Sequence, residues 1–388
     1  MSVNAPTIDV HIGTEKTGTT SIQHFLQRNR ETLLNQHGIC YPRCLGDRLS
    51  TNLAAACERP EKPDDLQRLR ELDSPQAVAD YYDRLRDSFV REVADSGASR
   101  VLISSEHLCS RLKTEEDLLR LREFLHSASD RVRIYLYLRR QDDFVLSLYS
   151  TSIKSGETLR FMFPAPGKAR HDMYYDRLLQ RWQAVFDTIE VGLYDRQRLL
   201  GNSIVTDFCH RLTLPDGLEV PEREENVALG AAALEFLREF NELVPRFVDG
   251  RLNPLRADIA QALGSMDIPG DKFRGDGGNR AFMSQFEQGN SEIARRWFAD
   301  DPSVPATLFA PTDDDGAVAP QQPFDRQQLL AVAAHLWCFS QSKVQASREW
   351  AASLHDQLAR EREAAEMRAN TEDDAAPRGF LARLLRRS

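Results

Sequence analysis

The sequence predicts an α/β fold: three α/β/α layers around a central, mostly parallel sheet, followed by a largely helical C-terminal region. Over the first 215 residues, apolar segments rich in β-formers alternate with amphipathic segments. Strands that alternate with helices in this way indicate a parallel sheet with crossover helices. Beyond that point the periodicity is mainly helical. A chain of 388 residues can form one large domain with insertions or two modest ones.

The first strand leads into a loop suited to an anion. A short apolar strand at Thr7–Ile12 is followed by the Gly-bounded loop Gly13–Thr20 and by a helix from Thr19 to about Gln36. The first N–H groups of a helix have no partner of their own, and the helix dipole adds positive potential there. Lys16 supplies a full charge, and hydroxyl donors follow at Thr17, Thr19, Thr20 and Ser21. We therefore expect a phosphate or sulfate group at this loop.

The spacing of the loop is P-loop-like without matching a Walker A motif. Gly13 and Gly18 have the separation that the motif requires, but position 19 is Thr and the lysine lies at position 16. A Walker lysine reaches the β- and γ-phosphates of a nucleoside triphosphate, and the next hydroxyl binds Mg²⁺. The displaced lysine favours a nucleotide with two adjacent anionic groups on its 5′ side over ATP with magnesium.

A second buried strand ends in two groups that can move a proton. Between the first helix and this strand we expect a short extended piece, a surface loop or irregular helical insertion, and an amphipathic helix, at Gly38–Pro42, Arg59–Pro75 and Pro75–Asp95. The strand covers Arg100–Ser105, and Glu106 and His107 follow at its carboxyl end. Either side chain can accept a proton from a hydroxyl. The alternative is that one of them caps the next helix or pairs with an arginine.

A third strand ends in arginine. A helix over Thr114–Ser127 precedes the strand Arg131–Leu138, and Arg139 and Arg140 stand at its carboxyl end, where ligands of open α/β sheets bind. Ser147 lies eight residues after Arg139 in the following helix. A guanidinium binds phosphate bidentately and a hydroxyl can orient it, so this pair indicates a second phosphate site. The alternative is two arginines at a solvated helix start.

The remaining elements are predicted from periodicity and composition. Gly156–Asp172 is predicted to be either a mobile flap over a site or a disordered loop. A helix, a strand and a helix follow at Tyr174–Phe186, Ile189–Tyr194 and Asn202–Leu214. Further helices are predicted over Val227–Val244, Pro254–Leu263, Arg280–Phe298 and Gln327 to about Met367, with a linker at Asp300–Phe324. The predicted domains are therefore 1–215, 216–300, 301–325 and 326–388.

The loop Lys16–Ser21, Lys-Thr-Gly-Thr-Thr-Ser, resembles the 5′-phosphosulfate loop of sulfotransferases that use 3′-phosphoadenosine 5′-phosphosulfate (PAPS), and especially that of bacterial carbohydrate-type members. Arg139 and Ser147 match the spacing of the family's 3′-phosphate motif. Arg140-Gln141 stands where the family often has Asp-Pro or Asn-Pro, which leaves open which arginine makes the contact. The family's catalytic histidine aligns with His107, and other branches use a glutamate, which makes Glu106 the rival. The resemblance covers residues 6 to about 215.

This resemblance implies transfer of a sulfonate group from PAPS to an acceptor hydroxyl, without a metal. The catalytic residues would be Lys16 and either Glu106 or His107. The residues implied for donor binding are Thr14, Lys16, Thr17, Gly18, Thr19, Thr20, Ser21, Arg139 and Ser147. By analogy the acceptor is a glycan or glycolipid, or another small molecule. Two other classes stay open: an ATP-using kinase-like P-loop enzyme and a non-catalytic nucleotide-binding scaffold.

The composition of the chain limits the classes of partner that it is expected to bind. A net charge of −9 does not suit a nucleic-acid-binding surface. Because no apolar stretch is long enough to span a bilayer and no signal-peptide pattern is present, we expect a cytoplasmic protein. The six scattered cysteines predict neither a zinc site nor disulfides. The basic amphipathic tail Gly379–Ser388 could touch an anionic membrane surface or a partner, or fray. The oligomeric state is open.

Overall fold

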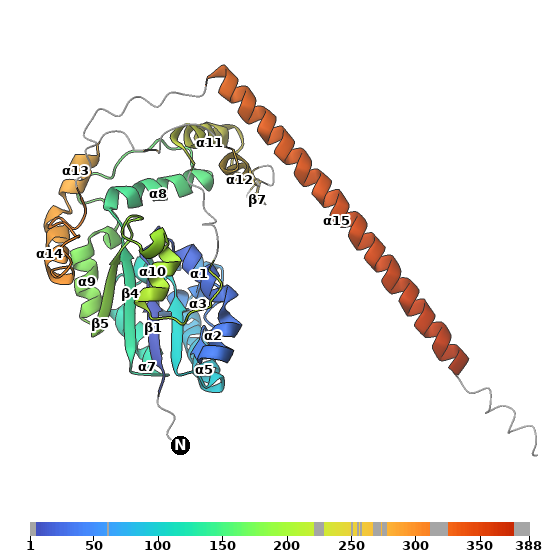
Figure 1. The fold of residues 1–388 in the computed structure, drawn as a ribbon, viewed down its shortest axis with the longest axis horizontal. Coiled ribbons are helices and arrows are strands. Elements are labelled where there is room, and N and C mark those ends of the chain that lie inside the picture. The colour runs from blue at the N-terminus through green and yellow to red at the C-terminus, as the bar shows by residue number, and fades with distance from the viewer. Residues whose placement is uncertain are drawn as a thin grey trace, which may run out of the picture. The chain divides into compact units, whose positions relative to one another are not determined.

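The computed structural model describes residues 5–59, 62–220, 229–249, 251–253, 256, 258–266, 273, 278–310 and 325–375. Its centre is a parallel sheet of five strands in the order β2-β3-β1-β4-β5 (Figure 1). The strands are β1 Thr7–His11, β2 Ile39–Cys40, β3 Arg100–Ser104, β4 Val132–Leu138 and β5 Thr188–Leu193. The strands predicted over these segments are confirmed, and the extended piece near residue 40 is an edge strand.

β1 occupies the middle of the sheet. His11 at its carboxyl end is in register with Ser104 of β3 on one side and with Tyr135 of β4 on the other. β3 and β2 lie on one side of β1, and β4 and β5 lie on the other. The direction in which the chain places its successive strands therefore reverses at β1. Ligands of open α/β sheets bind at such a point, outside the carboxyl ends of the strands. The loop after β1 therefore lies where the topology favours a ligand.

Helices cover both faces of the sheet, which confirms the predicted three-layer α/β/α fold (Figure 1). Successive residues of a strand point to opposite faces, so Ile134 faces one layer and Tyr135 the other. One face packs against α1 Thr19–Arg28, α2 Arg30–His37 and α10 Ile204–Arg211. The other packs against α3 Thr51–Cys57, α5 Pro75–Ser96, α6 Glu106–Arg111, α7 Glu115–His126 and α9 Tyr175–Gln183.

The single helix predicted over residues 19–36 is wrong in one respect, because it breaks at Asn29 into α1 and α2. The side chain of Asn29 donates to the carbonyl oxygens of Phe25 and Glu219, and its Oδ1 accepts the N–H of Glu219. Asparagine competes for backbone groups in this way and interrupts a helix. Likewise, residues 280–298 form two helices, α13 Asn279–Ser284 and α14 Glu287–Trp297.

A buried charge cluster joins the central strands. Asp9 of β1 has a fully buried side chain and forms ion pairs with Arg100 of β3 and Arg133 of β4. The Nε of Arg133 lies 2.7 Å from Oδ1 of Asp9. A buried carboxylate needs such partners, since its desolvation is costly when it is unpaired. The cluster therefore ties the three middle strands together at the start of the sheet.

An aromatic cluster surrounds α8, which spans Gln141–Lys154. Phe144 of α8 packs in this cluster with Phe282 and Phe286. Phe161 and Phe163, from the segment predicted as a flap or disordered loop, join the same cluster, with their ring centroids 4.7 Å apart. Outside a short 3-10 turn at His171–Met173, residues 156–173 contain no helix or strand. This segment is thus packed against α8.

The remaining described elements complete the list: α4 Asp65–Arg68, a 3-10 turn at Leu200–Asn202, α11 Ala231–Leu243, β6 Phe247–Val248, β7 Arg251–Leu252, α12 Ile259–Gly264 and α15 Arg326–Ala375. The chain divides into two compact units, Met1–Arg246 with Gly270–Gln321, and Phe247–Pro269 with Gln322–Ser388. In the second unit β6 and β7 pair antiparallel. α12 packs on α15, and Oγ of Ser265, directly after α12, lies 3.0 Å from Nε2 of His335.

Several predictions fall outside the described residues. They include the basic tail at 379–388, most of the linker at 300–324 and parts of the helices predicted from residues 227 and 254. The predicted helix from residue 327 is confirmed as α15, which runs longer than expected. None of the described helices is both long and apolar enough to cross a membrane.

Candidate functional site: an anion-binding loop

The loop between β1 and α1 needs its two glycines. Gly13 and Gly18 have φ values of 104° and 76°, a region that favours glycine. A Cβ at Gly18 would lie 2.8 Å from Cγ2 of Ile204, and one at Gly13 would lie 3.1 Å from Cα and Cβ of Glu106. The loop is therefore pressed against α10 on one side and against the start of α6 on the other. Glycine is the residue that this close approach requires.

Two threonines fix the shape of the loop from inside. The hydroxyl of Thr14 donates to the carbonyl oxygen of Tyr137 at 3.1 Å, and that of Thr17 donates to the carbonyl oxygen of Thr14 at 2.6 Å. Both threonines are buried. Their hydroxyls therefore bond the protein itself, which makes Thr14 and Thr17 supports of the loop. The sequence analysis counted the Thr17 hydroxyl among the donors to a ligand, and the resemblance implied Thr14 for donor binding.

The first turn of α1 presents unpaired donors. Gly18 stands at the N-cap in the left-handed conformation, and no side chain caps the helix. The N–H groups of Ser21 and Ile22 bond the carbonyl oxygen of Gly18, whereas those of Thr19 and Thr20 find no acceptor in the described part of the chain. Unpaired N–H groups at a helix start are the donors that bind phosphate and sulfate in proteins.

Lys16 lies among charged groups of both signs. Its Nζ donates to Oγ1 of Thr151 on α8 at 2.7 Å. Burial lowers the pKa of Lys16, while the nearby carboxylates of Glu15 and Glu106 act in the opposite direction. The positive charges of Lys154 and Arg139 lie close enough to lower that pKa further. Cations from the loop, from β4 and from α8 thus converge near the unpaired N–H groups of α1.

Of the two arginines after β4, Arg139 lies next to the loop. Its Nη1 donates to the carbonyl oxygen of Lys16 at 2.7 Å, and its guanidinium lies over the ring of Tyr194, 5.4 Å from the centroid. Arg140 instead pairs with Asp142 at 2.9 Å and donates to the carbonyl oxygen of Ala310. The geometry therefore favours Arg139 over Arg140 as the residue that could recognise a phosphate beside this loop.

Ser147 is half-buried on α8, one turn before Thr151. The hydroxyl of Thr151 accepts from Lys16 and donates to the carbonyl oxygen of Ser147 at 3.1 Å. Ser147 thus belongs to the segment that Lys16 contacts, although its own hydroxyl makes no contact with the loop among the described residues. The sequence did not indicate a role for Thr151, because the spacing from Arg139 pointed to Ser147 and no pattern singled out a residue one turn later.

Glu106 and His107 differ in their surroundings at the start of α6. Nε2 of Gln23 donates to Oε2 of Glu106 at 2.5 Å, while Oε1 has no partner in the described structure. Glu106 is close enough to Lys16 to raise the pKa of the lysine. The Nδ1 of His107 is buried and lacks a hydrogen-bond partner there, and its ring lies near Glu15. Glu106 is therefore the acidic group that faces the loop.

An ion-pair chain, which no sequence pattern indicated, links the loop to the segment before α9. The guanidinium of Arg170 lies 2.7 Å from Glu15 in the loop and 2.6 Å from Asp172. Burial alone would raise the pKa of Glu15, but hydrogen bonding and attraction from Arg170 keep it below its ordinary value. Glu15 is next to Lys16 in the sequence, yet its partner lies 155 residues away, beyond the reach of a local pattern.

Metal ligands are not grouped anywhere in the described part of the chain: no three or more His, Cys, Asp or Glu side chains lie together as a metal site needs. The six cysteines are free.

Comparisons with known proteins add one solved structure. No family model matches the chain, and no curated protein matches it. The chain is similar to the crystal structure of a sulfotransferase from Alicyclobacillus acidocaldarius, with 21% identity and a TM-score of 0.36. The match covers 57% of this chain and 86% of that one. The function proposed below rests on the residues of the site and not on this likeness.

Proposed function

We propose that the chain is a sulfotransferase that moves the sulfonate group of PAPS to an acceptor hydroxyl. The observation that carries the proposal is the convergence at one loop of Lys16, Arg139 and the unpaired N–H groups of Thr19 and Thr20. Together they offer directed donors and positive charge to a doubly anionic group. The Walker lysine that ATP would require is absent at position 19.

The donor would be held at two places. The backbone N–H groups from Thr17 to Ser21 would bind the 5′-phosphate and the sulfonate oxygens. Arg139 would bind the 3′-phosphate through its planar guanidinium, with the Ser147 hydroxyl as a second donor. The bond from Arg139 to the carbonyl oxygen of Lys16 supports this assignment, because it fixes the guanidinium beside the loop.

When bound, the donor supplies an activated sulfonate. A bond forms between the acceptor oxygen and sulfur, the bond from sulfur to the bridging phosphate oxygen breaks, and adenosine 3′,5′-bisphosphate leaves. Lys16 would stabilise the negative charge that develops on the bridging oxygen, as a positioned cation does at a transferring group. The acceptor proton would pass to Oε1 of Glu106, since Gln23 holds the other carboxylate oxygen. His107 is the second candidate for this role.

The acceptor we propose is a glycan, a glycolipid or another small molecule with a free hydroxyl, as the resemblance of the loop implies. A fold does not select among such acceptors. The cytoplasmic location and the contact of the C-terminal tail with a membrane surface stay predictions.

Ligand-dependent thermal unfolding tests the proposal. Adenosine 3′,5′-bisphosphate at 100 times its Kd would add about 2.7 kcal/mol of stability. We expect it to raise the Tm by several degrees, with smaller effects from AMP and from ATP with Mg²⁺. An equal or larger response to ATP with Mg²⁺ would favour a kinase-like enzyme, and no response to any nucleotide would refute the proposal.

Transfer itself is measured with ³⁵S-labelled PAPS and cell extracts as the source of acceptor. Label that appears in a product other than free sulfate supports the proposed reaction. A protein that binds adenosine 3′,5′-bisphosphate but transfers no label to any fraction would be a nucleotide-binding scaffold.

A further inference from the structure

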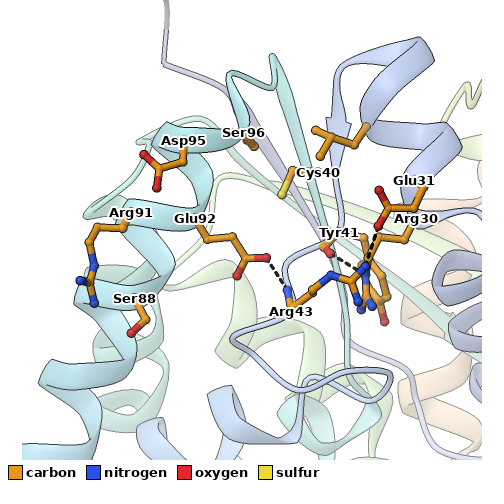
Figure 2. A pocket seen from close by; sticks show the side chains of 11 residues that line it. Arg30, Glu31, Cys40, Tyr41, Arg43, Ser88, Arg91, Glu92, Asp95 and Ser96 are labelled. Carbon is orange, nitrogen blue, oxygen red and sulfur yellow. Dashed lines mark hydrogen bonds and ion pairs between the residues drawn. The ribbon is translucent and has the colours of Figure 1, made fainter. Parts of the chain in front are cut away.

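The ion pairs of the chain differ in their exposure to solvent. Arg43 and Glu31 line a cavity of about 520 Å³ between α2 and α5 and pair with each other at 2.6 Å (Figure 2). Their side chains are 58% and 69% exposed, and a pair that is so exposed contributes little to stability. The side chains of Arg170 and Glu15 are 35% and 19% exposed, so water and salt screen this pair less. Because Glu15 lies in the anion-binding loop, the second pair can influence the charge of that loop.

Asp172 holds Arg170 in place from one side. The Nε and Nη2 atoms of Arg170 bond both carboxylate oxygens of Asp172, at 3.0 and 2.6 Å, and the side chain of Asp172 is fully buried. The guanidinium also lies over the ring of Phe144, 5.5 Å from the centroid. Its remaining nitrogen, Nη1, donates to Oε2 of Glu15 at 2.7 Å. Groups outside the loop therefore fix the position of Arg170, and Arg170 in turn fixes the carboxylate of Glu15.

The second carboxylate near Lys16 is also held by another donor. Oε2 of Glu106 accepts from Nε2 of Gln23 at 2.5 Å. The ammonium of Lys16 donates instead to the neutral hydroxyl of Thr151, and in the described part of the chain it forms no ion pair. Lys16 is thus a cation with two carboxylates nearby, Glu15 and Glu106, neither of which is its hydrogen-bond partner.

A carboxylate released next to Lys16 would compete with an anionic ligand. Glu15 directly precedes Lys16, and of the two nearby carboxylates it exerts the larger attraction on the lysine. Opposite charges within about 4–6 Å of each other stabilise their charged forms. If Glu15 lost its bond to Arg170, its nearest cation would be Lys16, and a ligand would have to displace it. The bond from Arg170 to Glu15 prevents this competition.

We infer that Arg170 is a positioning residue, which holds the carboxylate of Glu15 away from Lys16 and so keeps the lysine ammonium available to an anionic ligand. The inference deepens the function proposed above and rests on it for the identity of the ligand. A ligand would then have to replace only the neutral Thr151 hydroxyl as the partner of Lys16. Such preorganisation lowers the cost of binding, because the cation is in place before the ligand arrives.

A paired substitution tests the inference at constant net charge. Arg170→Met/Asp172→Asn removes one charge of each sign, leaves no carboxylate buried at position 172, and deprives Glu15 of its partner. Nuclear magnetic resonance of ¹³C-labelled lysine measures the pKa of Lys16, with its signal assigned through Lys16→Arg. This pKa should be higher by about 1 in the variant than in the wild type, because Glu15 then pairs with Lys16. Adding Glu15→Gln should remove the increase.

Two further variants complete this measurement. Arg140→Met/Asp142→Asn is the matched control: it removes a similar bidentate pair, at 2.9 and 3.1 Å, and leaves the bond between Arg170 and Glu15 in place. It should not change the pKa of Lys16. Should Arg170→Met/Asp172→Asn fail to fold, Arg170→Lys keeps a cation beside Asp172 but lacks the fork that reaches both carboxylates. It should raise the pKa of Lys16 in the same direction.

Calorimetric titration with adenosine 3′,5′-bisphosphate measures the consequence for binding. The Kd should rise about 10-fold in Arg170→Met/Asp172→Asn, which is about 1.4 kcal/mol, and adding Glu15→Gln should restore it. A purely structural loss would not be restored by removing Glu15, so weakened binding that persists in the triple variant overturns the inference. An unchanged pKa of Lys16 in a folded Arg170 variant also overturns it. A wild type that does not bind the nucleotide refutes the proposed function, whereas the pKa of Lys16 still decides the role of Arg170.

Discussion

Replacing Arg139 with lysine should weaken the binding of the 3′-phosphate and leave the binding of the rest of the ligand unchanged. The guanidinium is fixed by its bond to the carbonyl oxygen of Lys16 at 2.7 Å and by the ring of Tyr194. Lysine keeps the charge but loses the planar fork. A hydrogen bond to a charged group contributes about 1.5–3 kcal/mol. The Kd for adenosine 3′,5′-bisphosphate should therefore rise about 10- to 150-fold, while the Kd for AMP, which lacks the 3′-phosphate, should change little.

Isothermal titration of both nucleotides against the wild type and Arg139→Lys gives the difference directly. Arg140→Lys is the matched control, because Arg140 is engaged by Asp142 and by the carbonyl oxygen of Ala310. Equal weakening of the two nucleotides would show that Arg139 merely supports the loop. An effect confined to Arg140→Lys would reverse the assignment of the two arginines.

Two further predictions concern the loop, and a third concerns a buried carboxylate elsewhere in the fold. Lys16→Ala should lower the rate of sulfonate transfer about 100- to 1,000-fold with little change in Tm, and a near-normal single-turnover rate would remove its role. Glu106→Gln should abolish transfer more completely than His107→Gln, measured as kcat; the reverse order would assign the base to His107. Burial beside Asp64 raises the pKa of Glu58 to about 8, so the stability of the wild type should decline as the pH rises from about 4.5 to about 8. Glu58→Gln cannot ionise at this position, so its free energy of unfolding should rise relative to that of the wild type over that window. The difference between the urea midpoints of the two proteins should therefore be larger at pH 8 than at pH 5; an equal difference at both pH values would contradict the assignment.

Local patterns were enough to predict most of the core. Each strand of the sheet is short, apolar and bounded by polar residues, and the helix from Pro75 begins with a serine cap and a proline that sequence alone reveals. The break at Asn29 was missed because its cause is a contact with Glu219, distant in the chain. Tertiary contacts of this kind leave no periodic signal.

Sequence patterns likewise indicated some residues of the candidate site and missed others. The Lys16 loop and the arginine after β4 were visible because the residue types and their spacing are local. The choice of Arg139 over Arg140 needed the positions of Lys16 and Asp142, which only the fold supplies. The roles of Thr151 and Arg170 depend on side chains that meet across long separations, so no local pattern could have indicated them.

The three strands that bear the candidate residues are also the three that have a neighbour on each side. β3, β1 and β4 contribute Glu106, the anion-binding loop and Arg139, whereas the edge strands β2 and β5 carry none of them. Interior strands exchange their amide protons only when the whole sheet opens. The edge strand β5 still supports the site indirectly, because Tyr194, the residue directly after it, lies against the guanidinium of Arg139. A change at that margin of the sheet would therefore reach the arginine.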